Sequence, residues 1–223
     1  LPLPGRVMPA KGRGIRSNLA FEGLALTPDA RYLFAGLENA LEQDGPAAGV
    51  GVGSPARILR FDREDGERRA EFVYPVDPAP ATPAAAKAFR VNGLADLLPL
   101  DGERLLALER GYVEGVGNSV KLYAVSLAGA TDVAGVEALA GASFVPAHKT
   151  LLLDLADLGI PMENFEGTAF GPELPDGRGT LVIVSDDNFN PGQEATTFLV
   201  LAVDLAPATI ARIQGAGHRS PLA

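Results

Sequence analysis

Apolar runs alternate with short polar turns along the chain, and three stretches share one pattern. Each stretch begins with a polar residue followed by Gly, continues through an apolar run, a turn and a second apolar run, and closes on a carboxylate. The pattern places Glu22, Asn92 and Glu166 at matching positions, with 70 residues from the first to the second and 74 from the second to the third. A recurring spacing of this kind predicts a repeated structural unit.

Each repeat is expected to hold four short antiparallel strands. The second strands are expected at Tyr32–Leu37, Leu105–Leu108 and Thr180–Val184, after turns with Pro-Asp or Asp-Gly, dipeptides that favour tight hairpins. Further strands are expected at Arg57–Asp62, Ala70–Tyr74, Val120–Ser126 and Thr197–Asp204. Little helix is expected, and the short candidates are Ala84–Phe89 and Ala208–Ile213.

Repeated four-stranded units are typical of a β-propeller. We therefore predict an all-β, partial propeller with about three four-stranded blades, forming a single domain over residues 1–223 or the C-terminal portion of one. The repeat units span about 18–80, 90–160 and 163–213, with loop insertions at 42–56 and 77–88. Three blades cannot close a ring, so we expect the missing blades to come from upstream sequence or from a second chain. The alternative fold is a β-sandwich with hairpins that are similar by chance.

Matched positions in successive blades converge at one mouth of a propeller's channel. Glu22, Asn92 and Glu166 would form one ring there, and a second ring would hold the closing carboxylates Glu38, Glu109 and Asp186 or Asp187. Carboxylates that lie together repel one another unless some are protonated or a cation neutralises them. Oxygen ligands without His or Cys favour calcium, and after it magnesium. Alternatively, these acids cap turns by accepting hydrogen bonds from backbone N–H groups.

A cation bound by carboxylates could activate water and polarise a phosphoryl oxygen. The candidate catalytic residues are Glu22, Glu109, Glu166 and Asp186, and the candidate metal ligands are Glu22, Glu38, Glu109, Glu166, Asp186 and Asp187. Basic residues near these acids could hold the remaining phosphate charge. Arg110 is the first candidate for this substrate-binding role, followed by Lys149 and Arg16.

Composition and charge exclude several classes of protein and site. The formal charge is −9 without a basic run, which disfavours binding to nucleic acid. The absence of Cys excludes disulfides and a Cys nucleophile, and the two residues His148 and His218 are too few for a three-His zinc site. No apolar stretch reaches 18 residues, so no membrane span is expected. No Gly-x-Ser-x-Gly or phosphate-loop motif is present.

Four stretches carry a resemblance to a known family: Asn18–Asp29, Leu105–Gly111, Asn164–Pro172 and Val184–Phe189. They are similar to the phytase-like ("esterase-like activity of phytase") family of bacterial exported proteins, over about residues 18–201. The resemblance implies a propeller-like fold, a periplasmic or secreted location and phosphoesterase or phosphodiesterase activity on a small phosphorylated molecule. It assigns that activity to Glu22, Glu38, Glu109, Glu166, Asp186 and Asp187. It also implies two further strand-and-carboxylate units before Leu1.

Two other functions are compatible with the same pattern. Calcium lactonases with six-bladed propellers also use Glu, Asn and Asp ligands, so a lactonase-like hydrolase is one alternative. A non-catalytic propeller that binds a ligand or a partner, with calcium in a structural role, is the other. Several basic residues facing the carboxylates would favour a phosphate substrate, and none would favour a lactone or simple binding.

Overall fold

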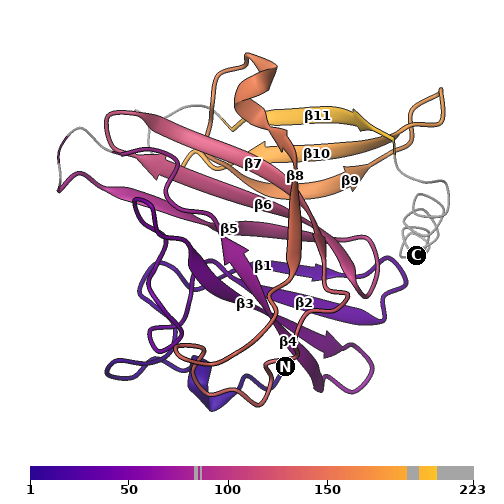
Figure 1. Ribbon diagram of the computed structural model, residues 1–223. Helices are drawn as coiled ribbons and strands as arrows, with labels where there is room; N and C mark the ends of the chain where they lie inside the picture. Colours follow the sequence, from indigo (N-terminus) through magenta and orange to yellow (C-terminus); the bar gives the residue numbers. More distant parts are fainter. Residues whose placement is uncertain (83–84, 86, 190–195, 205–223) are drawn as a thin grey trace.

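Three antiparallel sheets make up the computed structural model, which describes residues 1–82, 85, 87–189 and 196–204 (Figure 1). The first sheet contains β1 (Phe21–Leu26), β2 (Tyr32–Leu37), β3 (Ser54–Asp62) and β4 (Arg68–Val76). The second contains β5 (Arg90–Pro99), β6 (Arg104–Val113), β7 (Gly117–Ser126) and β8 (His148–Asp154). The third contains β9 (Phe165–Gly171), β10 (Gly179–Ser185) and β11 (Phe198–Val203).

The strands follow one another in chain order across each sheet, and the sheets are stacked in chain order (Figure 1). β1 contacts β5, and β5 contacts β9, so the first strands of the three sheets lie next to one another. This is the arrangement of propeller blades around an axis. The prediction of a partial, propeller-like all-β fold is thus confirmed, with four, four and three strands in the described residues.

Most strands lie where the hydrophobic pattern predicted them. β2 has the predicted bounds, while β3, β4, β6, β7 and β10 extend beyond them. β8 was not predicted, because its apolar run, Leu151–Leu153, does not alternate with polar residues as a half-buried strand does. In the fold, Leu151 and Leu152 are exposed. The helix candidate at Ala208–Ile213 lies outside the described residues, and residues 87–89 of the other candidate are not helical.

Helix is confined, in the described part of the chain, to two short 3₁₀ turns, η1 (Gly5–Val7) and η2 (Leu155–Leu158). Neither helix is long and apolar enough to cross a membrane.

Two apolar layers hold the sheets together, and β6 contributes to both. Leu105 and Ala107 pack between the first and second sheets, where the core also includes Phe34, Ile58, Tyr74 and Leu94. Leu106 and Leu108 pack between the second and third sheets, against Phe165, Leu181 and Ile183. Successive side chains of a strand point to opposite faces, so each face of β6 serves one layer.

The first two sheets approach closely because glycines lie at their contact. Gly23 of β1 pairs with Gly36 of β2. A Cβ atom on Gly36 would lie 2.8 Å from Leu97 Cδ1, and one on Gly23 would lie 3.0 Å from the Leu97 nitrogen. Larger residues would therefore push β5 away from β1. The same junction is fixed by a hydrogen bond of 3.0 Å from the backbone N–H of Leu94 to the carbonyl of Glu38.

A buried ionic network joins the N-terminal segment and a long loop to the first sheet. The Arg57 guanidinium donates to Asp44 at 2.6 and 2.8 Å and to Glu71 at 2.9 Å, and Arg6 donates to Glu71 at 2.5 Å. Arg57 also donates to the carbonyl of Val136 in the loop between β7 and β8. The network therefore fixes segments that surround the first sheet.

Candidate functional site

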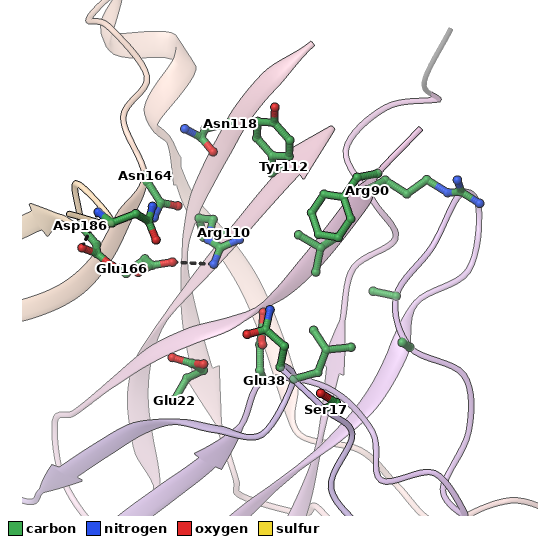
Figure 2. A pocket seen from close by; sticks show the side chains of 17 residues that line it. Ser17, Glu22, Glu38, Arg90, Arg110, Tyr112, Asn118, Asn164, Glu166 and Asp186 are labelled. Atoms are coloured by element: carbon green, nitrogen blue, oxygen red, sulfur yellow. Dashed lines mark hydrogen bonds and ion pairs between the residues drawn. The ribbon is translucent and has the colours of Figure 1, made fainter. Parts of the chain in front are cut away.

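A pocket of about 760 Å³ opens where the first strands of the sheets meet (Figure 2). All three sheets contribute charged side chains to its wall: Glu22 from β1, Glu38 directly after β2, Arg110 from β6, Glu166 from β9 and Asp186 directly after β10. Five of the residues predicted from the sequence are thus brought to one pocket.

The same local structure presents Glu22 and Glu166. Each lies in a Phe-Glu-Gly sequence, and each is the extra residue of a β-bulge, because Phe21 and Gly23 pair with consecutive residues of β2, and Phe165 and Gly167 with consecutive residues of β10. A bulge bends the strand and re-aims the side chain of its extra residue. The repeated motif therefore directs one carboxylate from each of the two sheets into the pocket.

The second sheet departs from this pattern. Asn92 pairs regularly with Gly111, and the bulge of β5 lies further along, at Ala95. The neighbouring Gly93 leaves space that the Glu38 side chain fills, since a Cβ atom on Gly93 would lie 2.4 Å from Glu38 Cγ. Next to the second sheet, the carboxylate in the pocket is thus that of Glu38, which follows β2 of the first sheet.

Arg110 lies among these carboxylates and forms an ion pair with Glu166 (Figure 2). Its Nε atom is buried and has no hydrogen-bond partner among the described residues. The guanidinium is thus held at one end by Glu166. Its side chain is 20% exposed and lines the pocket, so part of the guanidinium can reach an anionic oxygen or water.

Glu38 is a buried carboxyl group with an unusual environment. Glu38 is 5% exposed, and its side chain forms no hydrogen bond or ion pair within the described part of the chain. Burial raises the pKa of Glu38 to about 7; Arg110 lowers that pKa in part, and the charges of Glu22 and Glu166 raise it further. Burial and the charge of Glu166 also raise the pKa of Glu22, against the lowering effect of Arg110. Near neutral pH, Glu38 can therefore both accept and donate a proton.

Glu109 lies in a different place from the pocket carboxylates. The sequence predicted that its strand closes at Leu108, but β6 continues to Val113, so Glu109 is an interior strand residue. Because side chains alternate along a strand, Glu109 faces the first sheet, whereas Arg110 faces the third. The predicted second ring of closing carboxylates is therefore split by the strand geometry.

The Glu109 carboxylate has a full set of partners. It accepts hydrogen bonds from the Tyr74 hydroxyl at 2.8 Å, from Asn92 Nδ2 at 2.8 Å and from the backbone N–H of Asp77 at 3.2 Å, and it pairs with Lys149. Asn92, the middle member of the predicted first ring, is thus a partner of Glu109.

The two other basic residues proposed for substrate binding also lie outside the pocket wall. Lys149 pairs with Glu109 and with Asp77, the latter at 2.8 Å, and lies over the ring of Tyr123 at 4.3 Å. Arg16 donates to the carbonyls of Ala40 and Gly45 at 3.0 and 2.6 Å. Both side chains hold neighbouring segments in place.

The remaining acids lie at the start of the segment after β10. Asp186 lines the pocket, and its carboxylate accepts from the backbone N–H of Asn188. Asp187 accepts from the backbone N–H of Phe189 and from the Thr196 hydroxyl, and it does not line the pocket. In the part of the chain that the structure describes, no three Asp, Glu or His side chains are placed so that they could hold one metal ion.

Several pocket residues were not predicted from the sequence. They are mostly polar or aromatic: Ser17, Asn18, Phe89, Arg90, Tyr112, Asn118, Asn164 and Asn188. Tyr112 could have been found, because it follows Arg110 by two residues and so lies on the same face of the strand. Asn18 and Asn188 adopt left-handed backbone conformations, with φ of 58° and 52°, and no sequence signal identified them.

Comparison with known proteins gives one match. The chain matches no curated protein and no solved structure. A family model described as phytase-like, with esterase-like activity of phytase, matches residues 1–189, which include Glu22, Glu38, Arg110, Glu166 and Asp186. By this match over most of its length, the chain belongs to the phytase-like family.

Proposed function

We propose that this pocket hydrolyses a phosphate ester, with Arg110 binding the phosphoryl group and Glu38 transferring the proton. The observation that carries the proposal is the pairing of a cation with an acid–base group in one pocket: Arg110 faces the cavity that also holds the buried Glu38, whose pKa is about 7. The family supports a phosphoesterase-type hydrolase.

Each residue has a defined role in the proposed reaction. The Arg110 guanidinium donates to phosphoryl oxygens and stabilises the charge that develops on them, while Glu166 orients it through their ion pair. Water attacks phosphorus and forms the new P–O bond as the P–O bond to the alcohol breaks. The ionised Glu38 takes the proton from water, and the protonated Glu38 then gives it to the leaving oxygen. General acid–base catalysis of this kind contributes about 10²- to 10⁴-fold in rate.

The charge of the pocket favours an ester that carries a single negative charge. Four acidic residues, Glu22, Glu38, Glu166 and Asp186, line the same cavity as the two arginines Arg90 and Arg110. A dianionic phosphomonoester would be repelled by these carboxylates more strongly than a monoanionic phosphodiester. We therefore propose a small phosphodiester as the substrate class.

Calcium dependence remains a separate proposal. The pocket acids are the oxygen donors that calcium prefers. However, Arg110 already pairs with Glu166 among them, and the described residues hold no preformed group of three acidic or His ligands. The reaction above therefore uses only protein side chains. If calcium binds, EDTA should lower the melting temperature, and Glu166→Gln should weaken that response.

The decisive experiment measures hydrolysis of a phosphomonoester, a phosphodiester and a lactone by purified protein, with and without EDTA. We expect phosphodiester hydrolysis, reduced about 100-fold or more in Arg110→Gln. The matched control is Arg178→Gln, an exposed arginine paired with Asp176 outside the pocket, which should leave the rate unchanged. Hydrolysis of the lactone alone would favour the lactonase-like alternative. No hydrolysis of any substrate would favour a non-catalytic propeller.

The remaining expectations, an exported location and additional blades, stay predictions. Phe198 and Val200 are exposed on one face of β11, which supports the idea that a further sheet packs there. Cell fractionation tests the periplasmic or secreted location. Measurement of the mass of the purified chain in solution tests whether a second chain supplies blades, and a closed monomer of these 223 residues would contradict that idea.

A further inference from the structure

An aromatic wall forms one part of the pocket, away from the carboxylates. The rings of Phe89 and Tyr112 lie with their centroids 6.1 Å apart at an angle of 38°, and both residues line the cavity. Phe89 is 58% exposed although it is a large apolar side chain. Ligand pockets typically combine such aromatic surface with a few polar groups that fix orientation.

The position of the aromatic wall is fixed by the backbone. The N–H of Phe89 donates to the Glu114 carboxylate at 2.7 Å, and the N–H of Glu114 donates to the carbonyl of Phe89 at 2.9 Å. Tyr112 is an interior residue of β6 and pairs with Asn118 of β7. Both rings are therefore anchored to the second sheet.

Strand geometry relates this wall to Arg110. Arg110 and Tyr112 lie two residues apart on the same face of β6, which corresponds to about 7 Å along the strand. Figure 2 shows Tyr112 on the far side of Arg110 from Glu22 and Glu38. A phosphate held by Arg110 would thus have carboxylates on one side and the aromatic wall on the other. An aromatic group of the ester that reaches this side would bury its apolar surface against the two rings, which favours its placement there.

From this arrangement we infer that the pocket takes a phosphodiester in which one alcohol carries a planar aromatic ring, bound against Phe89 and Tyr112. The inference rests on the proposed function for the phosphate half of the ligand. The aromatic half rests on independent observations, namely the two rings, the exposure of Phe89 and their spacing from Arg110. Through ring stacking, the pocket should bind the aromatic diester about 5- to 10-fold more tightly than an aliphatic diester of the same charge.

The test compares three probes: methyl phenyl phosphate, dimethyl phosphate and benzyl alcohol. Dissociation constants and saturation-transfer NMR are measured for wild type, Phe89→Ala, Tyr112→Ala and Tyr112→Phe, together with rates of hydrolysis of the two diesters. Wild type should bind the phenyl diester about 5- to 10-fold more tightly than the dimethyl diester. Phe89→Ala and Tyr112→Ala should reduce that ratio to within about twofold, while Tyr112→Phe keeps it.

Phe198→Ala is the matched control, because Phe198 is an exposed aromatic residue outside the pocket, and it should leave the ratio unchanged. Phe89 lies in a loop, so Phe89→Ala keeps the test valid if Tyr112→Ala does not fold. Equal binding of the two diesters by wild type, or a ratio that survives in the Ala variants, would overturn the inference.

The probes also separate this inference from the proposed function. Ring protons of benzyl alcohol that receive saturation in wild type and lose it in Phe89→Ala would support the aromatic subsite even without any hydrolysis. Hydrolysis of a diester together with equal dissociation constants for the two diesters would support the phosphoesterase function and contradict the aromatic subsite. Binding is compared here because phenoxide is a better leaving group than methoxide, so the rates of the two diesters differ for chemical reasons alone.

Discussion

Glu109 and Glu38 are both buried glutamates near the centre of the molecule, with 2% and 5% of their surface exposed, but their surroundings differ. Glu109 lies between the first and second sheets, where a lysine, a tyrosine, an asparagine and a backbone N–H satisfy its oxygens. Glu38 faces the pocket, has no such partners among the residues that the structure describes, and has a pKa of about 7. Burial alone therefore does not identify a reactive carboxylate; the set of partners separates a structural acid from a chemical one.

The largest expected effect concerns the activity of the pocket acid. Glu38→Gln removes the group that transfers the proton, so the rate of phosphodiester hydrolysis should fall about 10²- to 10⁴-fold, while the protein stays folded. The measurement is kcat and kcat/KM at pH 7, with circular dichroism to check the fold. A variant with unchanged kcat would show that Glu38 has no catalytic role.

The matching change at Glu109 should affect stability first. Glu109→Ala leaves Lys149 and the hydroxyl of Tyr74 without their main partner, which should lower the free energy of unfolding by about 3 kcal/mol. Chemical denaturation measures this loss. The control is Glu103→Ala, because Glu103 is exposed in the turn that joins β5 to β6. This substitution should change the free energy of unfolding by less than about 0.5 kcal/mol. Equal stability of the two variants would contradict the structural role of Glu109.

The pH dependence of stability should distinguish Glu38 from its glutamine variant. The pKa of Glu38 is raised in the folded protein from 4.5 to about 7. Its contribution to stability is therefore full below pH 4.5 and is lost as pH rises through about 7. The free energy of unfolding of Glu38→Gln, taken relative to that of wild type, should therefore rise by about 3 kcal/mol between about pH 4 and pH 8. This figure corresponds to about 1.4 kcal/mol for each unit by which the pKa is raised. If the difference in free energy of unfolding between Glu38→Gln and wild type were the same at every pH in this range, the pKa of Glu38 would not be raised.

A smaller effect is expected from filling the space that Glu38 occupies. Gly93→Ala places a Cβ atom against the Glu38 side chain, which should cost about 1–3 kcal/mol of stability and lower activity. The double variant Gly93→Ala with Glu38→Ala removes the collision, so stability should return towards that of Glu38→Ala alone. Gly135→Ala is the control, since no atom lies within 4 Å of its added Cβ. Additive losses in the double variant would place Glu38 away from Gly93.

The sequence predicted the all-β fold, most strands, and five residues that line the pocket, because hydrophobic periodicity and the Phe-Glu-Gly motif are local features. These five residues are Glu22, Glu38, Arg110, Glu166 and Asp186. It did not predict the length of β6. A strand that ended at Leu108 would have left Glu109 at an open end, whereas the observed strand turns Glu109 and Arg110 to opposite faces.

The hydrophobic pattern of the sequence also did not predict which residues of neighbouring sheets are in contact. The fit of Glu38 over Gly93 depends on how closely the first sheet approaches the second, which the hydrophobic pattern of either sheet does not specify. The rings of Phe89 and Tyr112 come together for a similar reason, since Phe89 lies in a loop that is anchored to the residue after β6.

Titration of the Glu38 carboxyl group tests most simply whether this residue can transfer a proton at neutral pH. Carboxyl ¹³C NMR of protein labelled at glutamate should show a resonance that titrates near pH 7 and is absent from Glu38→Gln. A Glu38 resonance that titrates near its ordinary value of 4.5 would contradict proton transfer by Glu38, because this carboxyl group would then stay ionised at neutral pH.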